Sequence, residues 1–130
     1  MPSPLLLDIV TFLTANNAVA GDGIDTFRDF VPEKPDNVVA LIEYTGSPKV
    51  FYEEATNRSV QVSVRDKDAD VARRKALEIF KLFQSENSIV VFTPDRWGQV
   101  HLRQTPFKSG MDLSDRVTYA FNMGITTSIE

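Results

Sequence analysis

The stretch that decides the fold is residues 27–44, which read FRDFVPEKPDNVVALIEY. Pro32 and Pro35 each lack an amide donor and fix φ, so neither suits a helix interior or a central strand. They predict a stiff, extended approach to a strand, and Pro35-Asp36-Asn37 adds turn chemistry just before it. The near-continuous apolar segment that follows, Asn37–Thr45, predicts a strand buried on both faces.

Upstream of this stretch, the sequence predicts one helix and a weak strand. Ser3 suits the N-cap and Pro4 the first helical position. Asn16-Asn17 and Gly21-Asp22-Gly23 end the helix and begin a loop. Residues 24–31 fit either an extended loop or a short edge strand, and we favour the strand. The apolar side chains of the helix fall on one broad face, with Phe12 at its edge: Leu5, Leu6, Ile9, Val10 and Leu13.

Downstream, Gly46-Ser47-Pro48 stops the first strong strand, and Lys49–Asn57 predicts a surface loop. Ser59–Arg65 alternates between valines and polar residues, which predicts a half-buried strand. A second helix is expected over Ala69–Gln84, with Asp68 as N-cap and Asp70 in its first turn. Its apolar stripe has helical spacing and consists of Ala72, Ala76, Ile79, Phe80 and Phe83, widened by Leu77 and Leu82.

The C-terminal third predicts a hairpin, a loop and a long strand. Ile89–Phe92 and Gln99–Thr105 are strand-like and flank the Pro- and Gly-containing turn 93–98. Pro106–Asp115 is polar and predicts a loop. Arg116–Thr126 alternates over an unusual length, which predicts the last strand, and its apolar face consists of Val117, Tyr119, Phe121, Met123 and Ile125.

Together these segments predict a single α+β domain over residues 1–130. The expected order is helix, two or three strands, helix, three strands. An amphipathic helix can hide its apolar stripe only by packing it against another element. We therefore expect a mostly antiparallel or mixed sheet of four to six strands, packed by two helices.

Composition excludes several classes of protein. The 130 residues are 42% hydrophobic and 25% charged, which is typical of a globular chain. The net charge of −4 argues against nucleic acid as a binding partner, which normally needs a concentrated cationic surface. There is no cysteine, and therefore no disulfide, thiolate zinc site or thiol nucleophile. That composition suits a reducing cytosol.

The apolar run Leu5–Leu13 is interrupted by Asp8 and lacks a cationic leader, so it is a poor signal peptide. A bilayer span takes about 20 apolar residues, and this run is much shorter. The expectation is a soluble, intracellular product with no membrane partner.

Three features could indicate catalysis or metal binding, and each has a simpler interpretation. His101 on a strand has no Ser-His-Asp arrangement around it, and a solvated histidine is the better interpretation. Asp66, Asp68 and Asp70 have calcium-loop spacing, but the glycine and glutamate that such a loop needs are absent, so helix capping explains them better. Glu53-Glu54 is best explained by a solvated loop. We predict no catalytic residue, no metal site and no cofactor, and therefore no enzyme.

Aromatic side chains in loops are the better candidates for a binding role. Trp97, with Arg96 beside it, is expected at a hairpin tip, and we favour a partner contact there because tryptophan and arginine are enriched at interface centres. For Phe51 and Tyr52, a surface contact and folding back onto the core remain open. Arg73-Arg74 is interpreted as solvated helix surface.

Several of these motifs, taken in order, resemble one protein family. They are Phe27, Pro32, Pro35-Asp36-Asn37, Glu43-Tyr44, Gln61-Val62-Ser63-Val64-Arg65, the helix Ala76–Leu82 and Arg103-Gln104-Thr105-Pro106-Phe107. With them the chain resembles the small minor capsid or tail-completion proteins of long-tailed phages and prophages of Gram-positive bacteria. These belong to the tail terminator group. The resemblance spans Leu5 to Ile125.

The resemblance implies an α+β subunit of a homo-oligomeric, hexameric ring in the virion, assembled in the host cytoplasm from subunits that can be monomeric in solution. Such a ring caps the head-proximal end of the tail tube, stops polymerisation of the tube protein and presents a surface to the head connector or completion protein. DNA passes through without specific binding. No catalytic residue is implied. The loop Pro106–Asp115, with Phe107 and Lys108, is a candidate surface facing the lumen or the tube.

Two other interpretations remain open. The chain could be a different head–tail neck or connector-completion subunit, which association with isolated heads rather than tails would reveal. It could also be a small enzyme or ligand-binding domain. A compact pocket that gathers His101, Arg103 and a carboxylate would favour that interpretation, and a flat sheet face would oppose it.

Overall fold

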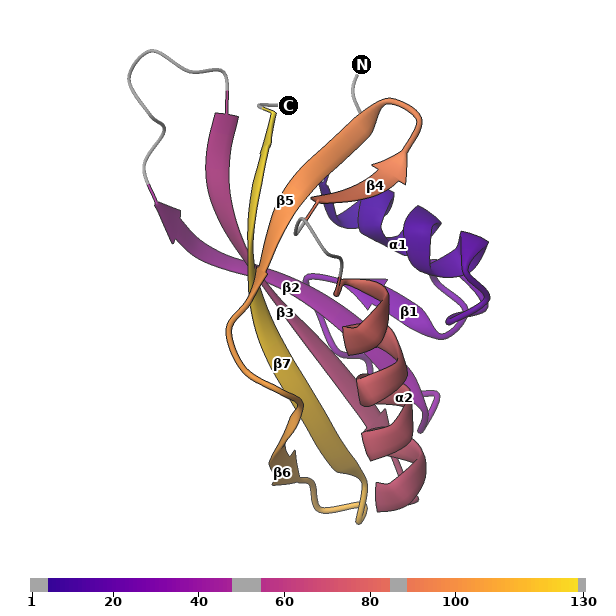
Figure 1. Cartoon of the computed structure of the whole chain (residues 1–130). Helices are drawn as coiled ribbons and strands as arrows, with labels where there is room; N and C mark the ends of the chain where they lie inside the picture. Colours follow the sequence, from indigo (N-terminus) through magenta and orange to yellow (C-terminus); the bar gives the residue numbers. More distant parts are fainter. Residues whose placement is uncertain (1–4, 48–54, 85–88, 129–130) are drawn as a thin grey trace.

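A computed structural model describes residues 5–47, 55–84 and 89–128, and it has the expected α+β architecture (Figure 1). In this part of the chain two helices accompany one curled, mixed sheet of seven strands. The elements in chain order are α1 Leu5–Ala15, β1 Thr26–Arg28, β2 Val38–Ser47, β3 Ala55–Asp66, α2 Ala69–Leu82, β4 Ile89–Thr93, β5 Arg96–Leu102, β6 Phe107–Met111 and β7 Val117–Ser128.

The last strand organises the sheet. The strand order is β1-β2-β3-β7-β5-β4, and β1 with β2 is the parallel pair in it. One edge of β7 pairs with β3 from Val117 to Ser128. The other edge is shared, because β5 pairs with residues 123–127 and β6 with residues 117–120. Strand β7 therefore connects both halves of the sheet.

Both helices lie on the same face of the sheet (Figure 1). Helix α2 packs across β3 and β7, and α1 packs against β4 and against β1 and β2. The core lies between these layers, where Phe80 meets Phe121 edge-on with ring centroids 5.3 Å apart. The largest fully buried side chains include Leu5, Ile9, Leu13, Leu41, Ile79, Phe83, Phe121, Met123 and Ile125.

The N-terminal predictions hold where the structure describes them. All five residues predicted for the apolar face of α1 are buried. Ser3 and Pro4 lie outside the described residues. The weak strand exists as β1, which has three residues and lies at one end of the sheet order.

The strand predicted over Asn37–Thr45 is confirmed as β2, which continues two residues further, to Ser47. Its first four residues, 38–41, are all buried, as expected for burial on both faces. On the helix-free face this burial is linked to the proline-containing segment. Arg65, the cross-strand partner of Val38, donates to the carbonyl oxygens of Pro35 and Asp36, so the segment is held over this end of the sheet.

Two predicted loops are wrong in part. Residues 55–57 belong to β3, where they continue the pairing with β7, whereas residues 48–54 lie outside the described residues. Pro106–Asp115 contains β6, which brings the described strand count to seven instead of four to six. Strand β6 is exposed along its whole length and has no apolar alternation, so it exists because β7 offers an edge to pair with.

The second helix is confirmed, although it ends at Leu82 rather than Gln84. Asp68 is its N-cap, and its carboxylate accepts from the backbone amides of Asp70 and Val71 at 2.9 and 3.4 Å. Leu77 does not widen the buried stripe as predicted, because it is 40% exposed.

The predicted hairpin is present, but its turn is shorter than expected. Thr93 pairs with Arg96, which leaves Pro94 and Asp95 as the connection. Strand β5 therefore starts at Arg96 and ends at Leu102 instead of spanning Gln99–Thr105. Arg96 and Trp97 are strand residues, so the prediction that they occupy the loop at the hairpin tip is wrong.

Candidate interaction surfaces

The face of the sheet opposite the helices is polar at its centre. Cross-strand register places Ser59, Gln61 and Ser63 of β3 on this face with Asn122 of β7, and His101 of β5 beside Gly124. Neither α1 nor α2 packs on this side (Figure 1). It is thus a candidate surface for contacts with other molecules.

An apolar ridge lies at the β4–β5 end of the same face. Val91 and Trp97 are direct cross-strand partners and are 62% and 61% exposed, and Ile89, two residues before Val91, is 48% exposed. The alternate β4 residues Val90 and Phe92 enter the core. Strand β4 is therefore apolar on both faces, and we call Ile89, Val91 and Trp97 the β4–β5 ridge.

Arg96, predicted as a partner contact, instead points into the protein. Its side chain is 4% exposed, and its Nε lies 2.5 Å from Oδ2 of Asp8, itself buried on α1. Strand alternation places neighbouring residues on opposite faces, so an outward Trp97 requires an inward Arg96. The guanidinium also lies 3.5 Å from the hydroxyl of Thr127. Sequence reasoning treated Asp8 only as an interruption of an apolar run, although an aspartate on a buried helix face signals a cationic partner.

A second feature of the helix-free face is a polar hollow of about 320 Å³. Arg103 is held there by hydrogen bonds to the Tyr44 hydroxyl at 2.9 Å and the Ser59 hydroxyl at 3.0 Å. Gly124 makes this position possible, because a Cβ atom there would lie 3.0 Å from the guanidinium. The lining residues are Arg58, Ser59, His101, Arg103, Gly124, Ile125 and Thr126.

This polar hollow brings His101 and Arg103 together, and none of its described lining residues is a carboxylate. Arg58 of the lining binds the carboxylate of Glu43 through two hydrogen bonds of 2.5 and 2.6 Å. The described part of the hollow therefore supplies two of the three groups that would favour an enzyme, His101 and Arg103, without the carboxylate.

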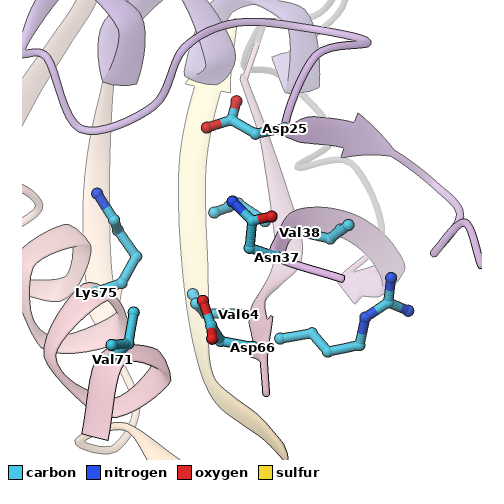
Figure 2. A pocket seen from close by; sticks show the side chains of 9 residues that line it. Asp25, Asn37, Val38, Val64, Asp66, Val71 and Lys75 are labelled. Carbon is cyan, nitrogen blue, oxygen red and sulfur yellow. The ribbon is translucent and has the colours of Figure 1, made fainter. Parts of the chain in front are cut away.

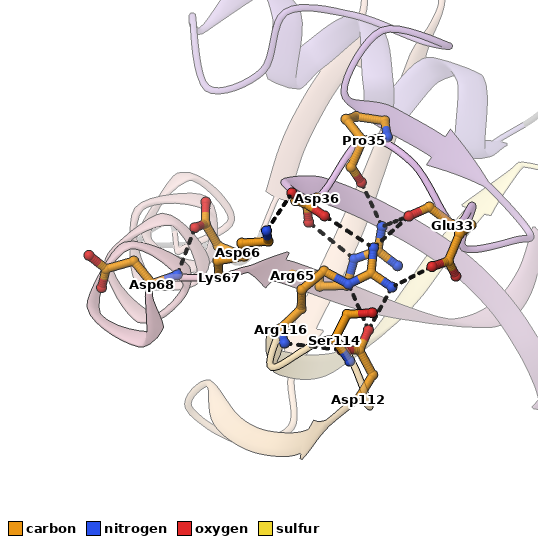
Figure 3. Close-up of polar contacts among 10 residues, drawn as sticks. All are labelled: Glu33, Pro35, Asp36, Arg65, Asp66, Lys67, Asp68, Asp112, Ser114 and Arg116. Atoms are coloured by element: carbon orange, nitrogen blue, oxygen red, sulfur yellow. Dashed lines mark hydrogen bonds and ion pairs between the residues drawn. The ribbon is translucent and has the colours of Figure 1, made fainter.

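Two arginines anchor the proline-containing segment (Figure 3). Arg65 donates to the carbonyl oxygens of Pro35 at 2.7 Å and Asp36 at 3.1 Å. Arg116 donates to the carbonyl oxygen of Glu33 and, at 2.7 Å, to the carboxylate of Asp112. Both arginines are buried. The cluster joins the segment before β2 to the end of β3 and the β6–β7 turn.

The charges in this cluster alter one another's ionisation. Hydrogen bonds from the Arg116 side chain and backbone hold the pKa of Asp112 below its ordinary range, and the same contact raises the pKa of Arg116. Burial acts to raise the pKa of Asp36, but the hydrogen bond and charge of Lys67 outweigh it, and the net pKa is lowered. Burial and the charge of Arg116 lower the pKa of Arg65. The cluster is a structural clamp stabilised by ionised carboxylates.

A smaller cavity of about 110 Å³ lies between α2 and the start of β2 (Figure 2). Its charged side chains already have partners within the chain. Lys75 donates to the carbonyl oxygen of Ala18 at 2.8 Å, and the Asp25 carboxylate accepts from the amides of Ala20 and Gly21. We interpret these contacts as fastening the loop after α1, not as a ligand site.

A third hollow, of about 440 Å³, opens beside β1 and is here named the β1 hollow. Phe27 and Phe30 meet edge-on in it with ring centroids 5.4 Å apart. Arg28 is paired with Asp22 at 3.1 Å at its rim. Its lining residues are Asp22, Gly23, Phe27, Arg28, Asp29 and Phe30, and the flanking side chains of Ile24 and Val31 are exposed.

The other predicted contact residues are scattered. Phe107 and Lys108 lie in β6, where both are exposed, and β6 is far along β7 from the β4–β5 ridge. Phe51 and Tyr52 lie outside the described residues, as does the pair Glu53-Glu54. The predicted contact residues that the structure describes therefore do not lie on one surface.

The capping interpretation of the aspartate series is confirmed for Asp68, and Asp66 also accepts from the amide of Asp68 at 2.9 Å. Within residues 5–47, 55–84 and 89–128, no three His, Cys, Asp or Glu side chains gather closely enough to hold a metal ion. In the same residues neither helix is long and apolar enough to cross a membrane.

Comparison with known proteins gives one family. The model of a family described as bacteriophage tail terminator protein matches residues 13–129, which is nine-tenths of the chain. No curated protein matches the chain.

Proposed function

This chain belongs to the bacteriophage tail terminator family, and from that membership we propose that it caps the head-proximal end of the tail tube, stops tube polymerisation and joins the tail to the head. It is a structural protein of the phage tail and part of the virion. The family is one of structural proteins rather than enzymes, and we propose that this chain likewise acts by binding and not by catalysis.

The proposal includes a homo-oligomeric ring, of hexameric stoichiometry, that forms on the tube from subunits that are monomeric in solution. Its partners are the tail tube protein on one side and the head connector or completion protein on the other. DNA passes through the ring without specific binding, in keeping with the net charge of −4. The ring is assembled in the host cytoplasm. The source we propose is a long-tailed phage or prophage of a Gram-positive bacterium, where such proteins are also termed minor capsid proteins.

The single observation that carries this proposal is the family match over residues 13–129. Exposed apolar side chains support it, because a ring subunit must contact neighbours through surface that is uncovered in the lone chain. The β4–β5 ridge provides such surface. Trp97, Phe107, Lys108, Phe51 and Tyr52 are proposed contact residues. Arg96 is left out because it is buried.

A different head–tail neck or connector-completion subunit is the second candidate, because the exposed surfaces fit any ring that binds both neighbouring copies and a tube or connector. A small enzyme or ligand-binding domain has less support. In the part of the chain that the structure describes, no carboxylate lines the polar hollow with His101 and Arg103.

Electron microscopy of particles assembled without this chain tests the function. We expect filled heads lying apart from tails of irregular or excessive length. Tails of uniform length beside detached or leaking heads would identify a head-side neck protein instead. Intact, infectious particles would refute both virion roles. Restoring the chain from a plasmid is the control, and it should return tail length and head attachment to normal.

A further inference from the structure

Two exposed apolar surfaces of this chain lie at opposite ends of the strand order. The β4–β5 ridge includes the terminal strand β4, and the β1 hollow lies beside the other terminal strand, β1. Four strands separate β1 from β4, which is roughly 24 Å along the sheet at about 4.8 Å per step. One surface projects and the other is recessed.

The two surfaces match chemically. Trp97 presents a large apolar ring system with one hydrogen-bond donor and no acceptor. The β1 hollow offers an aromatic surface, Phe27 and Phe30, next to the carboxylates of Asp22 and Asp29. Arg28 at the rim can stack on an indole face, where its charge is favourable. An aromatic ring with a single N–H donor therefore suits an aromatic recess with an acidic rim.

We propose that Trp97 of one copy inserts into the β1 hollow of the next copy, and that this head-to-tail contact links subunits in the ring. The inference rests on the proposed ring and identifies the surfaces that form it. Because the ridge and the hollow are different parts of the same chain, the contact is heterologous, and repeating it generates a closed ring or an open filament.

The charges at the two surfaces are compatible with a second copy as the occupant. Copies of this chain repel one another through their net charge of −4, so they approach best through a contact at which at least one side carries no charge. The ridge residues Ile89, Val91 and Trp97 carry no charge. Within the β1 hollow, Arg28 is paired with Asp22 at 3.1 Å, and the other carboxylate, Asp29, would meet the uncharged ridge.

The small surface area that this contact buries explains why the ring forms only during assembly on the tube. One inserted aromatic side chain buries about 150–250 Å², whereas a standard stable interface buries about 800 Å² per partner. A single contact is therefore weak in dilute solution. In a closed ring each subunit makes two such contacts, and binding to the tube raises the local concentration of subunits further.

Paired cysteines test the geometry. The chain has no cysteine of its own, so V91C on the ridge and V31C beside the hollow can be joined by a short bismaleimide without background. In assembled tails we expect the double variant V91C/V31C to give a ladder of multimers up to the full ring. Each single variant should give no ladder. L113C/V31C, with its first cysteine at an exposed β6–β7 position, is the matched control and should give none.

Other cross-linking results would overturn the inference. Dimers of V91C alone would indicate a symmetric contact, and V91C joined to the tube or head protein would identify a different occupant. Absence of the ladder, in tails that contain the chain and have normal length, would refute this contact while leaving the proposed function intact. Failure of the proposed function has its own signature, which is normal tail length without the chain.

Fluorescence gives an independent readout, because Trp97 is the only tryptophan. In the free chain the exposed indole should emit at long wavelength, and assembly should shift the emission to the blue. F30S should abolish the shift, whereas L113S should keep it. Circular dichroism and the thermal midpoint of both variants establish that they are folded. An unchanged shift in folded F30S would overturn the inference.

Discussion

Asp8 and Arg96, 88 positions apart in the sequence, form a buried ion pair that fastens α1 to the start of β5. Their side chains are 7% and 4% exposed. The Thr127 hydroxyl, 3.5 Å from the Arg96 guanidinium, donates in turn to the carbonyl oxygen of Trp97 at 3.0 Å. The pair thus connects the helix layer to the strand that carries the exposed Trp97.

Removing one member of this pair should be costly. D8A leaves the arginine buried without its counter-ion, and we expect a loss of about 3–5 kcal/mol in the free energy of unfolding, measured in urea. The double variant D8L/R96M removes both charges and should recover most of the loss. E78A, which breaks the exposed Lys75–Glu78 pair, is the control and should cost about 0–1 kcal/mol. Equal losses in D8A and E78A would contradict a special role for the buried pair.

The free energy of unfolding should fall in acid, because Asp112 and Asp36 stabilise the clamp in their ionised form. The pKa values of Asp112 and Asp36 are lower in the folded chain than in the unfolded one, so the unfolded state binds more protons in this range. Their contribution is fully present above the unfolded pKa of about 3.9 and is lost as pH falls through the lower folded values. Urea unfolding at pH 7, 5, 4 and 3 should show the decline below pH 5.

The variant D112N measures how much of this loss of stability in acid is due to Asp112. It should be less stable than the native chain at pH 7, and its unfolding free energy should change less between pH 5 and pH 3. A slope identical to that of the native chain would show that Asp112 does not contribute. D95N serves as the control, because Asp95 lies in the exposed β4–β5 turn, away from the clamp.

Two glycines of the sheet should respond differently to alanine. At Gly98 an added Cβ would lie 3.0 Å from Ile125, 3.1 Å from Phe92 and 3.3 Å from a backbone oxygen, so packed atoms must shift. We expect G98A to cost about 1–3 kcal/mol. At Gly124 the obstacle is the end of the flexible Arg103 side chain, which can move. G124A should therefore cost less than G98A by thermal unfolding, and the reverse order would contradict this account.

The N-cap of α2 should contribute measurably. D68A removes the acceptor for the amides of Asp70 and Val71, and we expect a loss of about 0.5–2 kcal/mol. D68S should keep most of the stability because a serine hydroxyl can accept the same bonds. A D68S variant as unstable as D68A would point to loss of the carboxylate's charge rather than of the cap.

Regular apolar patterns made much of the fold predictable. The alternation Val117 to Ile125 and the stripe Ala72 to Phe83 each repeat at one period over many residues, and burial on one face requires that repeat. Asp68 before the second stripe is a cap signal with a local mechanism. These elements hold in the structure because local preference and tertiary packing agree.

The parts that sequence reasoning missed depend on distant partners. Strand β6 is exposed along its whole length, so no pattern marks it, and only the free edge of β7 makes it a strand. In the sequence, Arg96 beside Trp97 is as typical of an interface as of a buried ion pair. The burial of Arg96 depends on Asp8, which lies on a helix 88 positions earlier. Of the predicted contact residues, Trp97 is exposed as expected, although its role as a contact stays a prediction.

The position of β7 has a consequence for synthesis of the chain. The ribosome makes β7 last of the seven described strands, yet β3, β5 and β6 all pair with it. While the nascent chain is growing, α2 can cover β3 but lacks β7, the other strand on which it packs. Because long-range pairing must await its last partner, the two halves of the sheet unite only after residues 117–128 have left the ribosome.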